Sequence, residues 1–293
     1  MWLISGGDGQ LAKAISKELT EKNISFIALN KLKLDITNYA NVDLIIDQYR
    51  PEVIVNCAAW TDVDGCEDDQ SSAYLINSES VSNLALKCAT LGIKLIHISS
   101  DYVFSGQKDS PWKTTDPTSP GTIYGKSKAR AEKYIVELGN LEYLIVRSSW
   151  IYSKWGVNFP KKIIKRILNG NYEFKIVSDQ IGQPTNAKDL ASVIVHLNEK
   201  QISRKVLHAS NSGSTNWFEF GRLIANKFKN LDIRIEPIST LQLNNPIARP
   251  KYSVLDCLQL SDLGINLLPE WDLSFSNEFE NILNQCQKEL YAK

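Results

Sequence analysis

The sequence predicts an α/β fold in which a doubly wound parallel sheet carries helices on both faces, followed by a smaller C-terminal lobe. Short, almost wholly apolar runs recur through the first half of the 293 residues, as in strands buried on both faces. Segments with helical periodicity separate these runs, which is the alternation expected of parallel strands joined by crossover helices. After Trp150 the alternation becomes irregular and loops are more frequent, which indicates the lobe.

Each predicted strand is an apolar run that ends at a turn-forming or polar residue. The runs are Trp2–Ile4, Phe26–Leu29, Val53–Asn56, Lys94–Ile98 and Tyr143–Val146. Later in the chain, residues 187–197 and 205–209 have the pattern of one more helix–strand unit. With right-handed crossovers, these strands form a Rossmann-like sheet.

The predicted helices lie between these strands, where apolar residues recur at helical spacing. The first follows a glycine-rich turn, and the second ends before Pro51. A long helix after Ser71 ends at Gly92, and another covers residues 124–138. Ile163, Ile164, Ile167 and Leu168 mark a helix in the lobe.

Composition excludes several classes of function. Acidic and basic residues balance at 33 each, which does not favour nucleic acid or an anionic membrane as a partner. No apolar run approaches the roughly 18 residues that cross a bilayer, and a strand at Trp2 argues against a signal peptide. The five scattered cysteines form no CxxC pair, so reduced thiols in the cytoplasm are expected. The three histidines have no metal-site spacing, and His97 is expected as a hydrogen-bonded core residue.

A glycine-rich turn, Ser5-Gly6-Gly7-Asp8-Gly9-Gln10-Leu11-Ala12, joins the first strand to the first helix. Gly6 allows the tight turn and Gly9 lets a phosphate approach the backbone, while Gln10 and Leu11 begin a helix whose amides face a pyrophosphate. Residues 1–150, with 186–210 contributing, are therefore predicted to bind a dinucleotide. Residues 151–293 form a discontinuous substrate-binding lobe.

The end of the second strand favours NADPH over NADH. NAD enzymes usually place an acid there to bind the ribose hydroxyls, whereas this chain has Asn30 and Lys31. Lys31 and Lys33 are available for a 2′-phosphate, and Asp35 and Ile36 are expected beside the adenine. NADH stays open as the alternative.

A catalytic constellation is predicted from Tyr124, Lys128 and Ser100. Tyr124 and Lys128 are four residues apart at the start of a helix, so they share one face. A cation beside the phenol should lower its pKa from about 10 towards neutrality. Ser100 directly follows a central strand and is expected to hold a substrate carbonyl together with Tyr124.

Over nearly its full length the chain resembles the dTDP-4-dehydrorhamnose reductase family of extended short-chain dehydrogenases. The resemblance rests on blocks at residues 6–11, 56–64, 99–106, 117–128, 147–152, 158–159, 179–185 and 248–253. It implies a cytoplasmic oxidoreductase of dTDP-rhamnose and O-antigen biosynthesis. Such an enzyme transfers hydride from NADPH to the 4-keto carbon of a dTDP-linked 6-deoxyhexulose.

The resemblance also implies residue roles. Tyr124 supplies the proton, Lys128 holds the nicotinamide ribose, and Ser100 completes the triad with help from Asp101. The remaining implied contacts are Ala58, Ala59 and Thr61 with the cofactor, and Val103, Trp150, Asn158 and Arg249 with the substrate. Arg249 is expected to meet a phosphate and Trp150 to wall the sugar pocket. A homodimer and a magnesium site are left open.

Some residues depart from the family pattern. Ser100 stands where threonine is usual, and the loop at residues 60–66 has Trp60, Asp62, Gly65 and Cys66. A relative making a 6-deoxytalose or a dihydrostreptose-type product would look similar. Two other interpretations stay open: a non-catalytic NADP-binding regulatory subunit like that of methionine adenosyltransferase, and a nucleotide-sugar epimerase. The intact Tyr124–Lys128 pair argues against the first, and the blocks at 147–150 and 179–185 against the second.

Overall fold

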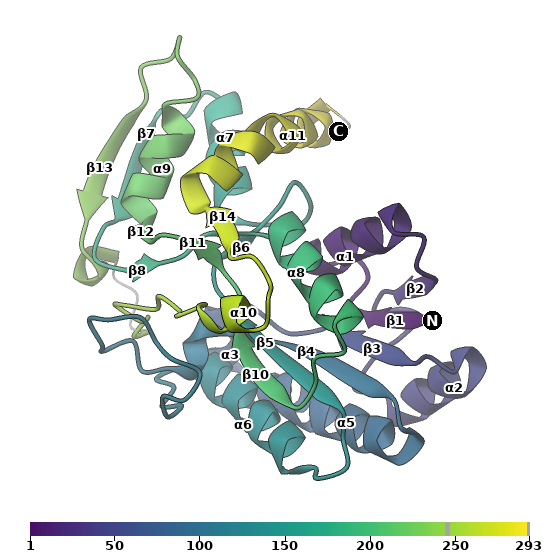
Figure 1. The fold of residues 1–293 in the computed structure, drawn as a ribbon. Coiled ribbons are helices and arrows are strands. Elements are labelled where there is room, and N and C mark those ends of the chain that lie inside the picture. Colours follow the sequence, from purple (N-terminus) through teal and green to yellow (C-terminus); the bar gives the residue numbers. More distant parts are fainter. Residues whose placement is uncertain (244–246, 292–293) are drawn as a thin grey trace.

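The computed structural model describes residues 1–243 and 247–291 (Figure 1). Its centre is a six-stranded sheet with the strand order β10-β5-β4-β3-β1-β2. Every pairing in this sheet is parallel, so the predicted doubly wound Rossmann-like architecture is confirmed. The strands are β1 (Trp2–Ser5), β2 (Phe26–Leu29), β3 (Val53–Asn56), β4 (Lys94–Ser100), β5 (Tyr143–Ser148) and β10 (Lys205–His208).

Helices cover both faces of the sheet because side chains along each strand alternate between two cores. One core joins Ile4, Val55 and Ile96 to α1 (Gln10–Glu21) and α8 (Ala187–Glu199). The other joins Leu3, Ile54 and Leu95 to α2 (Tyr39–Tyr49), α5 (Ser80–Leu91) and α6 (Ile123–Glu137). Figure 1 shows α1 and α8 on one side of the sheet and α5 and α6 on the other.

The segment before α5 differs from the single long helix expected after Ser71. It contains α3 (Val63–Asp68), α4 (Gln70–Tyr74) and a π-helical turn, η1 (Leu75–Glu79). Within this turn the buried Asn77 accepts a hydrogen bond from the Trp60 backbone N–H at 2.8 Å. Its amide also donates to the Trp60 carbonyl at 3.0 Å and to Ser127 Oγ at 3.2 Å. These long-range bonds favour the wider turn, which helical periodicity does not reveal.

The C-terminal lobe packs around an aromatic core that includes Tyr152, Phe220 and Phe275. Its two-stranded parallel sheet joins β7 (Glu173–Val177) to β13 (Arg234–Ile238). Its main helices are α7 (Phe159–Leu168), α9 (Trp217–Ala225) and α11 (Trp271–Tyr291). The smaller elements are η2 (Asp101–Val103), β6 (Ile151–Tyr152), β8 (Ile181–Gly182), β9 (Thr185–Asn186), β11 (Asn211–Ser212), β12 (Thr215–Asn216), η3 (Thr240–Leu243), α10 (Gln259–Asp262) and β14 (Leu268–Glu270).

Two segments distant in sequence complete the first sheet. Strand β10 pairs with β5 at its edge, and α8 packs against α1. Residues 187–208 thus lie with the first half of the chain, although β6 and α7 of the lobe precede them in sequence. Within the described ranges, no helix is long and apolar enough to span a membrane.

Candidate active site

Tyr124 and Ser100 are brought together by the start of α6 and the end of β4. The side chain of Thr122 caps α6 by accepting from Gly125 N at 3.1 Å, while Glu67 Oε1 accepts from Ile123 N at 2.7 Å. Gly125 packs directly on the Tyr102 carbonyl, where a Cβ would collide. The helix can therefore approach η2 closely enough for the Tyr124 hydroxyl to hydrogen bond with Ser100.

Asp101 extends this contact into the protein. Ser100 Oγ donates to Asp101 Oδ1 at 2.8 Å, whereas the buried Oδ2 has no hydrogen-bond partner among the described residues. Burial raises the pKa of Asp101 to about 6, although the nearby hydroxyl groups of Ser100 and Ser253 oppose the shift. Tyr124, Ser100 and Asp101 thus form a hydrogen-bonded row with a titratable acid at its inner end.

Lys128 lies on the same face of α6 as Tyr124, but its ammonium group is not directed at the phenol. Lys128 Nζ donates to the Ile98 carbonyl at 2.6 Å and lies 3.2 Å from His97 Nε2. Burial raises the pKa of Tyr124 above its usual 10, and burial lowers the pKa of Lys128 to about 8. The expectation that Lys128 lowers the phenol pKa is therefore wrong for this structure, because desolvation exceeds the effect of a cation directed elsewhere.

Two cavities concern the predicted ligands. One, of about 590 Å³, lies beside the glycine turn, and the other, of about 650 Å³, is lined mainly by residues of the lobe. The smaller cavity has among its walls seven residues predicted for the cofactor, namely Gly6, Gly9, Lys31, Asp35, Ile36, Ala58 and Ala59. Gly6 has φ +66°, and a Cβ there would lie 2.9 Å from the Ala58 backbone nitrogen. Gly9 precedes α1 without capping it through a side chain, so the first amides of the helix are open to a ligand. These features fit a dinucleotide pyrophosphate.

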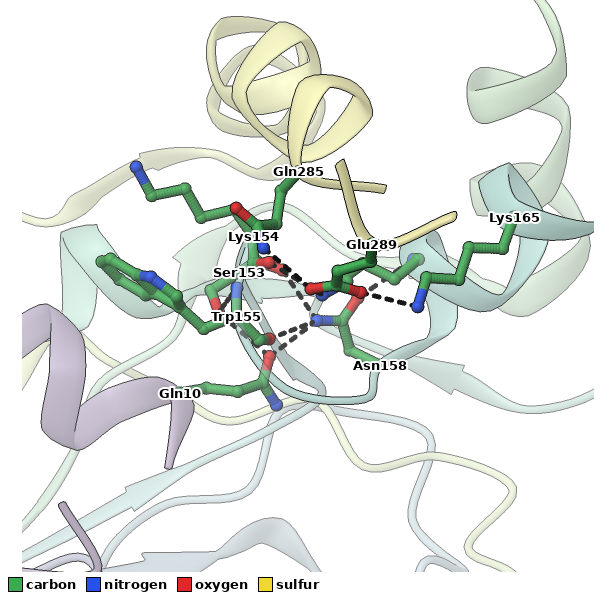
Figure 2. A network of polar contacts seen from close by, with 9 residues as sticks. Gln10, Ser153, Lys154, Trp155, Asn158, Lys165, Gln285 and Glu289 are labelled. Atoms are coloured by element: carbon green, nitrogen blue, oxygen red, sulfur yellow. Dashed lines mark hydrogen bonds and ion pairs between the residues drawn. The ribbon is translucent and has the colours of Figure 1, made fainter. Parts of the chain in front are cut away.

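Four other residues predicted for the cofactor do not line this cavity. Leu11 is buried in the core, Thr61 is exposed, and Asn30 has a buried amide oxygen without a hydrogen-bond partner. Gln10 turns its side chain towards the lobe, where its Oε1 accepts from Asn158 Nδ2 at 2.7 Å (Figure 2). Lys33 also lies outside the described lining, which leaves Lys31 as the lysine placed for a 2′-phosphate.

The larger cavity lies between the lobe and η2. Four cationic residues line it, and none of its described lining residues is acidic; the cations are Lys162, Arg166, Lys175 and Arg249. Trp150 forms one wall and stacks on Trp217 with ring centroids 3.6 Å apart. Trp150 also has φ +45°, a conformation that is strained for a large side chain. The cavity thus combines aromatic walls with a surplus of positive charge.

Three of the residues predicted to bind the substrate are engaged or buried within the protein. Arg249 lines the larger cavity but pairs with Asp64, with Nη2 2.7 Å from Oδ1. Asn158 also lines it, yet its amide caps α7 through Lys161 N and bonds to Gln10 and Ser153 (Figure 2). Val103 is fully buried beside Phe104, so its side chain cannot reach a ligand.

Tyr124 packs against one residue from the wall of each cavity. Trp60 lines the smaller cavity and Tyr102 the larger one, and both pack in one cluster with Tyr124. The rings of Tyr102 and Tyr124 lie 5.5 Å apart in an edge-to-face arrangement. Tyr124 thus contacts side chains from the walls of both cavities, although it lines neither of them itself.

Four residues that line the larger cavity were not predicted from the sequence, namely Lys162, Arg166, Lys175 and Trp217. Lys162 and Arg166 are one helical turn apart on α7, beside the face that buries Ile163 and Ile167. That pattern is also typical of an ordinary solvent-exposed helix face, so it carried no distinct signal. Trp217 directly follows the capping residue Asn216, a position that helix periodicity alone does not connect with Trp150.

Comparison with known proteins agrees with this geometry. The family model described as the RmlD substrate binding domain matches residues 1–284. The chain is 34% identical over 285 residues to dTDP-4-dehydrorhamnose reductase of Streptomyces griseus, covering 95% of this chain and 92% of that protein. The chain belongs to the dTDP-4-dehydrorhamnose reductase family. Its members are NAD(P)H-dependent oxidoreductases.

Other members of the reductase family are similar to a comparable degree. The dTDP-4-keto-6-deoxy-D-glucose reductase of Streptomyces niveus is 32% identical, with 95% of this chain and 96% of that protein covered. A solved structure of dTDP-4-dehydrorhamnose reductase from Bacillus anthracis, in complex with NADP, superposes with a TM-score of 0.90 at 36% identity. That match covers 96% of this chain and 98% of the other. Among the residues that the structure describes, no group of three or more His, Cys, Asp or Glu side chains is arranged to hold a metal ion.

Proposed function

We propose that this chain reduces the 4-keto group of a dTDP-linked 6-deoxyhexulose with NADPH, converting dTDP-4-dehydro-L-rhamnose to dTDP-L-rhamnose or acting on a closely related sugar. One observation carries the proposal: Tyr124 packs in one cluster with Trp60 from the wall of a dinucleotide-type cavity and with Tyr102 from the wall of a cationic, aromatic one. The family assignment supports the reaction type. The Streptomyces niveus relative, named for another 4-keto sugar, keeps the identity of the sugar open.

The smaller cavity provides the cofactor site. Gly6 and Gly9 leave the backbone free for the pyrophosphate, and Lys31 is the candidate for the 2′-phosphate. Lys128 would bind the nicotinamide ribose from the floor of the site. When bound, NADPH supplies the hydride for the carbonyl carbon.

Tyr124 supplies the proton that the carbonyl oxygen gains. Reduction turns the C=O bond into an alkoxide, and the phenol donates its proton there so that an alcohol results. The raised pKa of Tyr124 keeps this proton on the phenol until the alkoxide forms. Ser100 orients the phenol, and Asp101, once protonated, can donate to Ser100 and release the Ser100 hydroxyl proton towards the substrate.

The larger cavity would bind the nucleotide-linked sugar. Arg249 and the α7 pair Lys162 and Arg166 offer charge-assisted hydrogen bonds to a diphosphate. Trp150, stacked on Trp217, would form one wall of the sugar site.

We propose the corresponding division of the chain, in which residues 1–150 and 186–210 bind NADPH and the rest of 151–293 binds the substrate. A cytoplasmic location is proposed too, supported by five free cysteines.

The deciding experiment measures NADPH oxidation by the purified protein with a panel of dTDP-4-keto sugars. We expect turnover with at least one of them, and weaker binding of NADH than of NADPH in a parallel calorimetric titration. The Tyr124→Phe variant should fold and bind NADPH, with kcat lower by about 10²–10⁴ because the general acid is lost.

Two results would overturn the proposal. Binding of NADPH without reduction of any keto sugar would favour the non-catalytic regulatory subunit. Interconversion of two sugar epimers without net NADPH consumption would favour the epimerase.

A further inference from the structure

A row of buried polar side chains crosses the sheet beneath the cofactor site. Ser5 ends β1, Asn56 ends β3, His97 lies in β4 and Lys128 projects from α6. Ser5 Oγ lies 2.7 Å from Asn56 Oδ1, Asn56 Nδ2 lies 3.2 Å from His97 Nδ1, and His97 Nε2 lies 3.2 Å from Lys128 Nζ. All four are at most 2% exposed. The mechanism described above leaves His97 without a role.

The direction of these hydrogen bonds follows from the backbone. Asn56 Oδ1 accepts from Ser5 Oγ and from the Ala58 N–H at 3.2 Å, so the amide nitrogen faces His97. His97 Nδ1 must therefore accept, and a neutral imidazole then carries its one proton on Nε2. That proton points at Lys128 Nζ.

This arrangement suits Lys128 as a neutral amine. Its lone pair accepts from His97 Nε2 while one of its own N–H groups donates to the Ile98 carbonyl at 2.6 Å. An ammonium has no lone pair, so it would require His97 to carry its proton on Nδ1, opposite the N–H groups of Asn56. Turning the Asn56 amide to relieve this would sacrifice its bond from Ala58 N–H.

The other groups near Lys128 do not offset the preference of this side chain for the neutral amine form. Burial lowers the pKa of Lys128 to about 8 and that of His97 well below 6.5, so His97 is neutral. Glu132, one turn further along α6, attracts the ammonium but is engaged by Arg147 of β5 through Nη2–Oε2 at 2.6 Å. The remaining titratable groups nearby are Tyr124 on α6, Asp101 in η2 and Cys57 after β3, whose thiol has a pKa raised to about 12.

We propose that His97 is a positioning residue that favours the neutral amine form of Lys128 before the cofactor binds, so that NADPH binding at alkaline pH is coupled to proton uptake by Lys128. The anionic cofactor and its ribose oxygens favour an ammonium that can donate to them. Lys128 takes that proton from solvent. The inference rests on the proposed NADPH site and not on the identity of the sugar.

The test measures proton uptake directly. NADPH is titrated into the protein by calorimetry between pH 7 and 9, in pairs of buffers with different ionisation enthalpies. We expect little uptake near pH 7 and about half a proton or more near pH 8.5, where a group with a pKa of about 8 is largely neutral. In His97→Gln the side-chain oxygen can accept from an ammonium, so uptake near pH 8.5 should be clearly smaller than in wild type. His196→Gln, in an exposed position on α8, is the control and should match wild type.

A second measurement does not depend on a variant. Nitrogen-15 NMR of the cofactor-free protein near pH 8.5, where Lys128 is largely neutral, should identify His97 as the Nε2–H tautomer. Either an Nδ1–H tautomer, or NADPH binding near pH 8.5 without proton uptake, would overturn the proposal. Equal uptake by wild type and His97→Gln would do the same. Failure to bind NADPH at all would instead contradict the proposed function.

Discussion

At the scale of single residues, Asp101 is an ionisable side chain that the folded protein buries, although burial disfavours its charged form. Its carboxyl group is 2% exposed, and burial raises its pKa from 3.8 to about 6. Between these two values the folded protein holds a proton that the unfolded chain has lost. The contribution of Asp101 to stability is therefore fully present below about pH 3.8 and is lost as pH rises through about 6.

Asp101→Asn should accordingly stabilise the protein at pH 8. Asparagine resembles the protonated acid and removes a buried charge, a gain of up to about 3 kcal/mol that should disappear near pH 4. Thermal unfolding at both pH values checks this. The rate should also lose its dependence on a group with a pKa of about 6, measured as kcat against pH. An asparagine variant less stable than wild type at pH 8 would contradict the argument.

Arg249 is the residue for which substrate recognition can be separated from cofactor binding. It lines the larger cavity, and its ion pair with Asp64 is partly exposed and hence weak. Arg249→Ala should raise KM for the sugar nucleotide by roughly 30- to 160-fold, since a charge-assisted contact contributes about 2–3 kcal/mol. NADPH affinity should stay within about twofold. Steady-state kinetics and calorimetry test both statements.

Lys251→Ala is the matched control for Arg249, because Lys251 is an exposed cation close in sequence but outside the described cavity lining. It should leave KM near the wild-type value. An equal rise of KM in both variants would mean that general positive charge, and not the position of Arg249, attracts the substrate.

At the scale of elements, the contact between α6 and η2 sets the position of the catalytic tyrosine. A Cβ on Gly125 would collide with the Tyr102 carbonyl, and backbone atoms cannot swing away as a side chain can. Gly125→Ala should therefore displace α6, lower stability by about 1–3 kcal/mol and reduce kcat. Gly121→Ala is the control, because a Cβ there meets no atom within 4 Å. Denaturant unfolding and kcat are the measurements, and equal behaviour of the two variants would refute this account of α6.

Element prediction succeeded where the signal is local and failed where it comes from distant contacts. The strands were predictable because each is a short apolar run beside a turn, and α6 because its apolar residues recur at helical spacing. The π-helical turn at Leu75–Glu79 was missed because it depends on bonds between Asn77 and Trp60, 17 residues apart. No periodicity of side chains records such a contact.

At the scale of the whole molecule, the two cavities were not equally predictable from the sequence. The glycine turn and the Tyr124–Lys128 pair are local motifs that the fold brings to one edge of the sheet. The cationic cavity combines α7, β7 and the segment at Arg249, so its charge becomes apparent only when the lobe is folded. For the same reason Asn158 was expected at a ligand, whereas the structure engages its amide in joining Gln10 to the loop before α7 (Figure 2).

The position of β10 and α8 late in the sequence limits how this protein can be divided into modules. Strand β10 shields the edge of β5, and α8 covers the apolar surface of α1. A fragment ending at residue 150 would leave an unpaired strand edge and a bare hydrophobic face, both of which promote aggregation. An engineer who wants to transplant the dinucleotide half into another enzyme must therefore carry the chain through about residue 210. During synthesis on the ribosome, too, the first sheet stays incomplete until part of the lobe has been made.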